Sequence, residues 1–136
     1  MSATDLTFDG DLGEVERLGE EIEWFCEENG VSGEVEFDLN LALEELFVNA
    51  VKHGGCAGVK EAARVRLELR DGAIHVSFSD RGRAFDPSTA PEPDLDAPLA
   101  GRTPGGLGLH LVRHTMRDLQ YRRADDWNHI TMWRPI

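Results

Sequence analysis

Residues 63–79 read ARVRLELRDGAIHVSFS, and this stretch decides the fold class. Apolar and charged residues alternate over 63–70, and apolar and polar residues alternate again over 73–79, as in strands with one buried face. The dipeptide between them, Asp71-Gly72, is a typical two-residue hairpin turn. Because a tight hairpin pairs its strands antiparallel, the stretch argues against a doubly wound parallel sheet.

Upstream of the hairpin, the pattern predicts an edge strand over residues 4–9 and two helices. The first helix spans 11–29, where apolar residues recur at three- and four-residue steps. Asp11 is expected to cap this helix, with a glutamate three residues later completing a capping box. The second helix spans about 38–53. Residues 34–39 alternate and fit either a strand or the start of this second helix.

Downstream, residues 106–118 are predicted to form a third helix, and residues 119–124 and 128–134 two closing strands. Residues 80–104 hold five of the six prolines, and an irregular stretch of this length in a small domain is usually a functional loop. We therefore expect a single domain over residues 1–136. Its fold class is an α/β (α+β) two-layer sandwich, with a mixed, mainly antiparallel sheet covered on one face by about three helices.

The composition excludes several classes of protein. Among 136 residues, 26 are acidic and 14 are Lys or Arg, which gives a formal net charge of −12. Such a chain is poorly suited to bind nucleic acid or to adsorb to an anionic membrane. No apolar run is long enough to span a membrane, and the first residues do not resemble a secretory signal. Cys26 and Cys56 lack metal-ligand spacing and indicate reduced thiols rather than a disulfide, so we expect a cytoplasmic protein.

The negative charge is concentrated in the N-terminal part of the chain. Residues 1–61 carry 16 acidic and 3 basic side chains, a net charge of −13, whereas residues 62–136 carry 10 acidic and 11 basic side chains, a net charge of +1. The outer face of the first predicted helix is rich in glutamate. This face is either simply solvated or, as a hypothesis, the surface that meets a basic protein partner.

Residues 44–54 read EELFVNAVKHG and fall on the second predicted helix. At about 100° per residue, Asn49 and Lys52 lie roughly 40° and 20° from Glu45 around the helix axis, so the three side chains share one stripe. Such a stripe could bind magnesium through the amide oxygen, contact phosphates through Lys52 and use Glu45 as a base. The alternative is a solvated helix face with one i,i+4 pair.

Two further segments contain glycines at informative positions. Residues 80–87 read DRGRAFDP directly after a predicted strand, and an acceptor carboxylate at Asp80 beside Gly82 suits recognition of an adenine amino group. A polar turn is the alternative. Residues 105–109 read GGLGL at a helix start, where free backbone N–H groups attract anions. A flexible hinge for the proline-rich loop is the alternative, and the segment is neither a Walker loop nor a Rossmann fingerprint.

In this order and spacing, the three segments resemble the boxes of the GHKL ATPases, which have the Bergerat, or histidine-kinase-like ATPase, fold. Residues 45–54 resemble the N box, residues 80–87 the G1 box, and residues 105–109 the G2 box that follows an ATP lid, here about 87–105. An acid four residues before the N-box asparagine and Phe-Asp-Pro after the G1 glycine are similar to the bacterial anti-sigma factor serine/threonine protein kinases.

This resemblance implies roles for individual residues. Asp80 would accept a hydrogen bond from the adenine amino group, and Asn49 would ligate Mg²⁺ between the phosphates. Glu45 would be the general base for a serine hydroxyl of a partner protein. Thr131, in the final strand, would lie near the adenine. With Lys52 from the helix stripe included, the candidate nucleotide-binding residues are Asn49, Lys52, His53, Asp80, Gly82, Ala84, Phe85, Gly105, Gly106, Leu107, Gly108, Leu109 and Thr131.

The resemblance also implies a function. It implies an ATP- and Mg²⁺-dependent protein serine kinase that phosphorylates a STAS-type anti-sigma factor antagonist and sequesters a sigma factor by partner switching, with homodimers common in the family. Ala84 replaces a second glycine that many GHKL proteins have, and because alanine is small we expect ATP binding to persist. The alternative is a non-catalytic, nucleotide-gated protein-binding regulator of a signalling circuit. A histidine-kinase catalytic domain and a conformational ATPase are disfavoured, because the chain leaves no room for a phosphoacceptor hairpin or a transducer domain.

Overall fold

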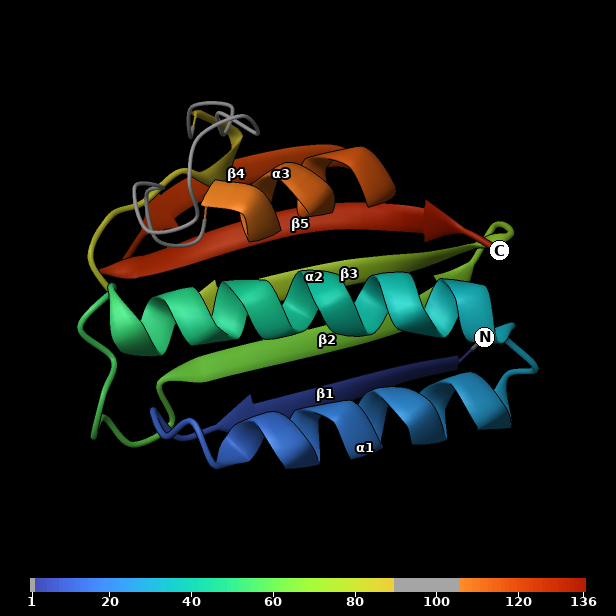
Figure 1. The fold of residues 1–136 in the computed structure, drawn as a ribbon, viewed down its shortest axis with the longest axis horizontal. Helices are drawn as coiled ribbons and strands as arrows, with labels where there is room; N and C mark the ends of the chain where they lie inside the picture. Colours follow the sequence, from blue (N-terminus) through green and yellow to red (C-terminus); the bar gives the residue numbers. More distant parts are fainter. Residues whose placement is uncertain (1, 90–105) are drawn as a thin grey trace.

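The hairpin predicted from residues 63–79 lies inside a five-stranded sheet (Figure 1). Its strands are β2 (Ala63–Arg70) and β3 (Ala73–Asp80). They are joined by Asp71 and Gly72 with φ of 52° and 72°, the left-handed values that a tight hairpin turn requires. The structure is a computed structural model, and it describes residues 2–89 and 106–136.

The remaining strands extend the sheet on both sides of the hairpin. They are β1 (Ser2–Phe8), β4 (Arg117–Ala124) and β5 (Trp127–Pro135), and the order is β1-β2-β3-β5-β4. β1 is an edge strand, as predicted. Each neighbouring pair is antiparallel, so the sheet that the structure describes has no parallel pairing. This register places Asp80, the last residue of β3, directly opposite Asn128 of β5.

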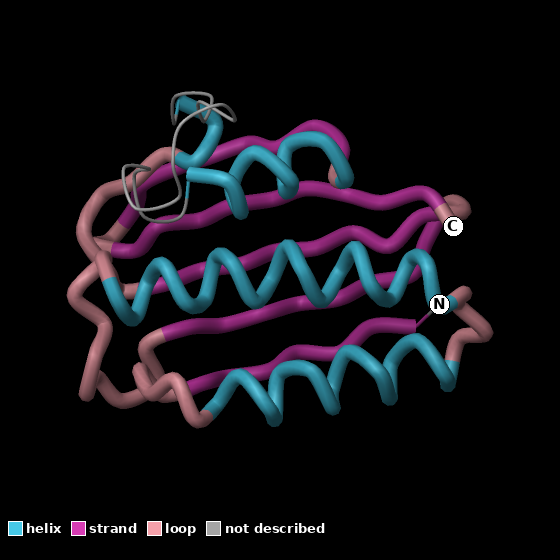
Figure 2. Tube along the Cα trace, in the orientation of Figure 1, coloured by secondary structure: helices cyan, strands magenta, loops and turns pink. Residues whose placement is uncertain are grey.

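Three helices cover one face of this sheet, as Figure 1 and Figure 2 show, and the fold class is the predicted two-layer sandwich. They are α1 (Glu14–Glu28), α2 (Gly33–Lys52) and α3 (Gly106–Thr115). The hydrophobic core fills the space between the helices and the inner face of the sheet. Its largest fully buried side chains are Phe8, Phe25, Phe47, Phe78, Leu18, Ile22, Leu39, Leu43, Leu67, Ile74, Val76 and Val112.

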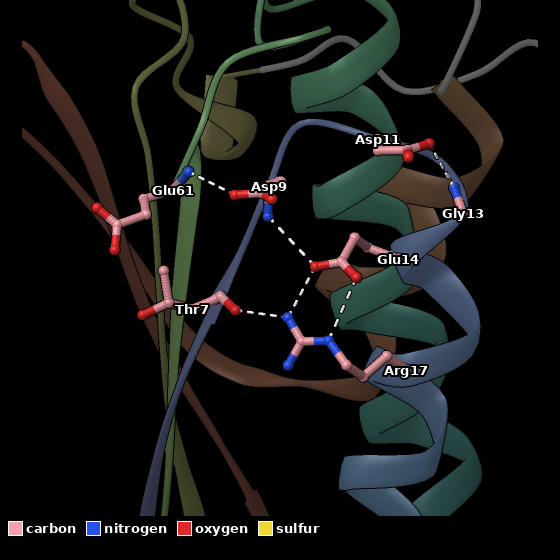
Figure 3. A network of polar contacts seen from close by, with 7 residues as sticks. All are labelled: Thr7, Asp9, Asp11, Gly13, Glu14, Arg17 and Glu61. Carbon is pink, nitrogen blue, oxygen red and sulfur yellow. Dashed lines mark hydrogen bonds and ion pairs between the residues drawn. The ribbon is translucent and has the colours of Figure 1, made fainter.

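The start of α1 differs from the prediction. Gly13, not Asp11, occupies the N-cap position, and no side chain caps the helix. The Asp11 carboxylate accepts a hydrogen bond from the Gly13 N–H instead, within the turn before the helix (Figure 3). Glu14 accepts from the Asp9 N–H and pairs with Arg17 at 2.7 Å, and Arg17 also donates to a backbone carbonyl of β1. Glu14 and Arg17 therefore connect α1 to the end of β1, and Asp11 and Glu14 do not form a capping box.

The ambiguous residues 34–39 are helical. Ser32 caps α2, since its hydroxyl accepts a hydrogen bond from the Val35 N–H at 3.4 Å. Val35 and Leu39 are buried four residues apart, whereas Phe37 between them is 67% exposed. This is the spacing of one helix face, so the apparent alternation does not mark a strand.

Four other expectations can be compared with the structure. Cys26 and Cys56 are buried free thiols, and burial raises the pKa of Cys26 to about 11. α3 ends at Thr115, three residues before the predicted end, because β4 begins at Arg117. Of the predicted lid, only the short 3₁₀ turn η1 (Pro87–Thr89) falls within the described residues. In the part of the chain that the structure describes, no helix is both long and apolar enough to cross a bilayer.

Candidate functional site

A cavity of about 260 Å³ lies at the carboxyl end of α2, where that helix meets α3 and the adjacent ends of β3 and β5. Its walls are largely apolar, with a few polar groups among them, which is the usual character of a small-molecule site. The residues that line it come from segments far apart in the sequence. They are Leu46, Asn49, Ala50, His53, Gly54, Phe78, Asp80, Arg83, Ala84, Phe85, Leu109, Asn128 and Ile130.

Asp80 is the buried acid of this cavity, with 6% of its surface exposed. Its Oδ1 accepts two hydrogen bonds, from the Gly82 N–H at 2.7 Å and from Nδ2 of Asn128 at 3.0 Å. Burial raises the pKa of Asp80, and these two bonds partly oppose that shift. Among the described residues, none donates to Oδ2, so this oxygen is the acceptor that a ligand can use.

The loop after Asp80 is tied to the end of α2. A Cβ on Gly82 would lie 2.9 Å from the carbonyl oxygen of Gly54, closer than real side chains approach. The next residue, Arg83, donates its N–H to the same carbonyl at 2.8 Å and its guanidinium to the His53 carbonyl at 2.7 Å. Glycine at position 82 is therefore what allows this loop to pack against the end of α2 and to form one wall of the cavity.

Glu45 lies on α2, one turn before Asn49, and is half-buried. Its Oε1 accepts a hydrogen bond of 3.3 Å from Nδ2 of Asn49. Burial raises the pKa of Glu45, and the negative charge of Glu44 raises it further. On the facing helix, a Cβ on Gly108 would overlap the Glu45 carboxylate. The glycine of α3 thus lets the two helices meet at this carboxylate.

Asn49 has the chemistry expected of a single protein ligand for Mg²⁺. Because its amide nitrogen donates to Glu45, its carbonyl oxygen is available to the cavity that it lines. Mg²⁺ prefers oxygen ligands and usually takes only one or two of them from protein, the rest from phosphates and water. No cluster of three or more His, Cys, Asp or Glu side chains suited to a metal occurs within residues 2–89 and 106–136. The residues present therefore fit a cation held mainly by a bound triphosphate.

Comparisons with known proteins agree with this geometry. Residues 8–134 match the sequence model of the histidine kinase-like ATPase domain. The chain belongs to this family. The resemblance to GHKL ATPases read from the motifs is confirmed, and membership of an ATPase domain family implies that the chain binds ATP.

Two similar proteins extend the comparison. The serine/threonine-protein kinase BtrW of Bordetella bronchiseptica is 37% identical over 101 residues, which are 74% of this chain and 71% of BtrW. A solved structure of the RsbU and RsbW domains of Rv1364c from Mycobacterium tuberculosis matches 99% of this chain, with a TM-score of 0.73 and 18% sequence identity. The match covers 32% of that longer chain, and at this identity it shows the fold alone.

The structure of this ATPase domain brings most of the predicted residues of the N and G1 boxes to the cavity. Asn49, His53, Asp80, Ala84 and Phe85 all line it. In the G2 segment, Leu109 lines the cavity, Gly108 faces Glu45, and Gly106 and Leu107 are the first two residues of α3. Glu45, Gly82 and Lys52 are not among the residues that line the cavity, and Lys52 is exposed. Gly105 lies outside the described residues.

Thr131 requires a correction. We expected it near the adenine, but it is exposed on the opposite face of the sheet, in a shallow groove with Ser77 and Gln120. Side chains alternate along a strand, so once Asn128 and Ile130 face the cavity, Thr131 must face away from it. The residue of the final strand that does reach Asp80 is Asn128.

Asn128 was missed because the motif alone does not give strand register. A signal was nevertheless present in the sequence. If β3 and β5 pair antiparallel and Asp80 ends β3, the first residues of β5 must lie opposite it. Tyr121 and Arg123 of β4 were also missed, and both donate hydrogen bonds to Oδ1 of Asn128.

Proposed function

We propose that this chain is an ATP-dependent protein serine kinase that acts as an anti-sigma regulatory factor. It phosphorylates a serine of a STAS-type anti-sigma factor antagonist and sequesters a sigma factor by partner switching. The observation that carries the proposal is the Glu45 carboxylate beside Gly108 of α3. Glu45 does not itself line the cavity, but it is hydrogen-bonded to Asn49, which does. A half-buried acid with a raised pKa at this place is suited to act as a general base for a hydroxyl.

Asp80, which lines the cavity, selects the base. Oδ2 of Asp80 accepts a hydrogen bond from the adenine amino group, and the apolar side chains of Leu46, Phe78 and Ile130 contact the ring. The glycine at position 82 lets the loop after Asp80 pack against the end of α2. The triphosphate then extends toward Asn49 and the start of α3, where backbone N–H groups favour anions.

Phosphoryl transfer depends mostly on positioning and charge neutralisation. The serine oxygen of the antagonist attacks the γ-phosphorus while the bond to the bridging oxygen of ADP breaks. Glu45 accepts the proton that the serine hydroxyl loses. When bound, Mg²⁺ neutralises phosphate charge, and Asn49 is the residue of this chain that would ligate it.

The decisive experiment compares two substitutions that remove the same charge from the same helix. Glu45→Ala should lower phosphoryl transfer from labelled ATP to a STAS-type antagonist by about 10²- to 10⁴-fold and leave ATP affinity largely unchanged. Glu44→Gln, at an exposed neighbouring position, should retain transfer at neutral pH. Transfer that persists in Glu45→Ala would overturn the assignment of the base, and failure of the unaltered chain to bind ATP would overturn the whole proposal.

The alternative is a non-catalytic regulator whose partner choice is gated by nucleotide. It predicts that ATP and ADP change partner binding while no labelled phosphate reaches any captured protein. A pull-down with and without Mg-ATP, followed by a phosphotransfer assay on the captured protein, separates the two functions.

The partner and compartment form part of the same proposal. We place the protein in the cytoplasm, where a sigma factor and its antagonist act, and propose that it works as a homodimer. The exposed glutamates of α1, among them Glu16, Glu20 and Glu23, would face a basic region of a partner. The net charge of −13 over residues 1–61 supports this arrangement.

A further inference from the structure

Asn128 is the centre of a buried hydrogen-bond network behind the acid of the cavity. It is 2% exposed. Its Nδ2 donates to Oδ1 of Asp80 at 3.0 Å and to the Arg83 carbonyl at 2.7 Å, so both of its N–H bonds are used. Its Oδ1 accepts from the Tyr121 hydroxyl at 2.7 Å and from the Arg123 guanidinium at 3.2 Å. A third donor, the Phe85 N–H, lies 3.3 Å from the same oxygen.

These contacts fix the orientation of the amide. If the amide were flipped, its NH₂ group would face three donors and its oxygen would face the Asp80 carboxylate and the Arg83 carbonyl. Each of those pairings would leave a buried polar group unsatisfied. The NH₂ group must therefore point at Asp80.

The orientation of the Asn128 amide determines how the Asp80 carboxylate is held. Both hydrogen bonds that the structure gives it end on Oδ1, one from Asn128 and one from the Gly82 N–H. A carboxylate that is held by one oxygen presents the other oxygen in a defined direction. The described residues thus leave Oδ2 as a single, oriented acceptor at the wall of the cavity.

We propose that Asn128 is the positioning residue that makes Asp80 selective for a purine with an exocyclic amino group. The proposal rests on the proposed function, in which Asp80 recognises adenine. Asn128 acts through Asp80 and not on the nucleotide directly. Without it, Oδ1 would lose one of its two donors, and the carboxylate could turn or bind water in place of the amino group.

The test measures the affinity ratio between ATP and purine riboside triphosphate, which lacks the 6-amino group. In the unaltered protein the ratio should be roughly 10 to 100, the contribution of one hydrogen bond to a charged acceptor. In Asn128→Ala the ratio should fall toward 1. A merely structural role would weaken both ligands equally and leave the ratio unchanged, and that result would overturn the proposal.

A second variant, Asn128→Asp, keeps the size of the side chain at this position. It is expected to show the opposite pH dependence of the affinity ratio. Asn128→Asp retains an acceptor for Tyr121 and Arg123 but places a second carboxyl 3.0 Å from Asp80. Two carboxyls this close cannot both ionise readily, so the pair retains a proton whose O–H can replace the lost N–H donor. Arg123 and His129 also interact electrostatically with Asp80, so neither residue is changed in this variant.

The pH dependence of the affinity ratio then distinguishes the two proteins. In the unaltered protein, the ratio falls as the pH is lowered and Asp80 takes up a proton. In Asn128→Asp, it falls as the pH is raised and the pair loses its shared proton. Taking the ratio cancels the titration of the phosphates, which both ligands share. Identical pH profiles for the two proteins would overturn the proposal.

Thr131→Ala is the matched control, because Thr131 lies on the same strand as Asn128 but is exposed on the face of the sheet that points away from the cavity. Its affinity ratio and pH profile should match those of the unaltered protein. Urea unfolding of each variant verifies the fold, and Asn128→Asp serves if Asn128→Ala does not fold. The unaltered protein failing to bind ATP would count against the proposed function, whereas normal ATP selectivity in both Asn128 variants would count against the role of Asn128 alone.

Discussion

Asp80 and Glu45 are both acids whose pKa is raised by burial, but the structure holds them in different ways. Asp80 is bonded by groups from its own loop and from a strand 48 residues away in the chain. Among the described residues, Glu45 accepts one bond, of 3.3 Å, from the next turn of its own helix, and it lies where Gly108 of α3 comes close. A group that recognises a base and a group that takes up a proton must both be held near the productive geometry. Long-range strand pairing holds Asp80 in place, whereas local helix geometry and one helix–helix contact hold Glu45.

The largest effect on nucleotide affinity is expected at Asp80. Asp80→Asn can keep the two bonds to Oδ1 but puts an NH₂ donor where Oδ2 accepted from adenine. ATP affinity, measured by isothermal titration calorimetry, should fall on the order of 100-fold. An equal loss of affinity for purine riboside triphosphate would contradict this explanation.

Asp80→Asn also tests how the charge of Asp80 affects the stability of the fold. Because the pKa of Asp80 is raised in the folded state, its ionisation costs the folded state free energy once the pH exceeds that pKa. Removing the charge should therefore leave the free energy of unfolding at pH 7 unchanged or increased, and the increase should vanish at low pH. Urea titrations at several pH values would measure this. Marked destabilisation at pH 7 would mean that the ionised carboxylate is needed to hold the loop.

A smaller effect is expected where the second acid meets α3. In Gly108→Ala, the added methyl group overlaps the Glu45 carboxylate, so either the acid or the helix must move. Phosphoryl transfer should fall by roughly 10- to 100-fold, the usual cost of misplacing a reacting group by about 1 Å. Gly33→Ala is the control, since its Cβ would meet open space. Equal rates in the two variants would show that Glu45 has room to move.

The pH profile of transfer should report the environment of Glu45. The rate should fall as the pH is lowered through the pKa of Glu45, with a midpoint above that of an exposed glutamate. Because the charge of Glu44 raises this pKa, Glu44→Gln should move the midpoint downward. An upward shift, or none, would argue that another group controls the profile.

The smallest effect is expected far from both acids. Reversing the charge of Glu20, Glu23 and Glu27, all exposed on α1, should change ATP affinity by less than about twofold at physiological salt, because exposed charges at this range are screened. Binding to the antagonist should weaken and become less sensitive to salt. A large change in ATP affinity would show that α1 and the nucleotide site are coupled.

The sequence predicted most of the fold because alternation and turn chemistry are local signals. The Asp71-Gly72 hairpin is of this kind, and so are the helices around it. The prediction for Asp11 was wrong because its carboxylate binds the Gly13 N–H in the turn before the helix, and the sequence pattern does not determine which nearby residue takes the N-cap position.

In the candidate site, too, local sequence signals were easier to read than long-range strand register. The motif segments located Asn49 and Asp80, since each lies at a fixed place relative to a helix or strand end. Thr131 was placed wrongly because one position along a strand reverses the face of the sheet. Asn128 acts only through its pairing with β3, which depends on long-range register.

The pairing of Asp80 with Asn128 also has a consequence for how the protein matures. β5 is inserted between β3 and β4, so the acceptor for the base is not fixed until this late segment of the chain has docked. A ribosome-bound chain that has not yet exposed residues 127–135 would contain the N and G1 boxes but bind nucleotide poorly. Once β5 docks, ATP binds the completed sheet more tightly and stabilises it by mass action. Nucleotide binding thus favours the state in which β5 is paired with β3.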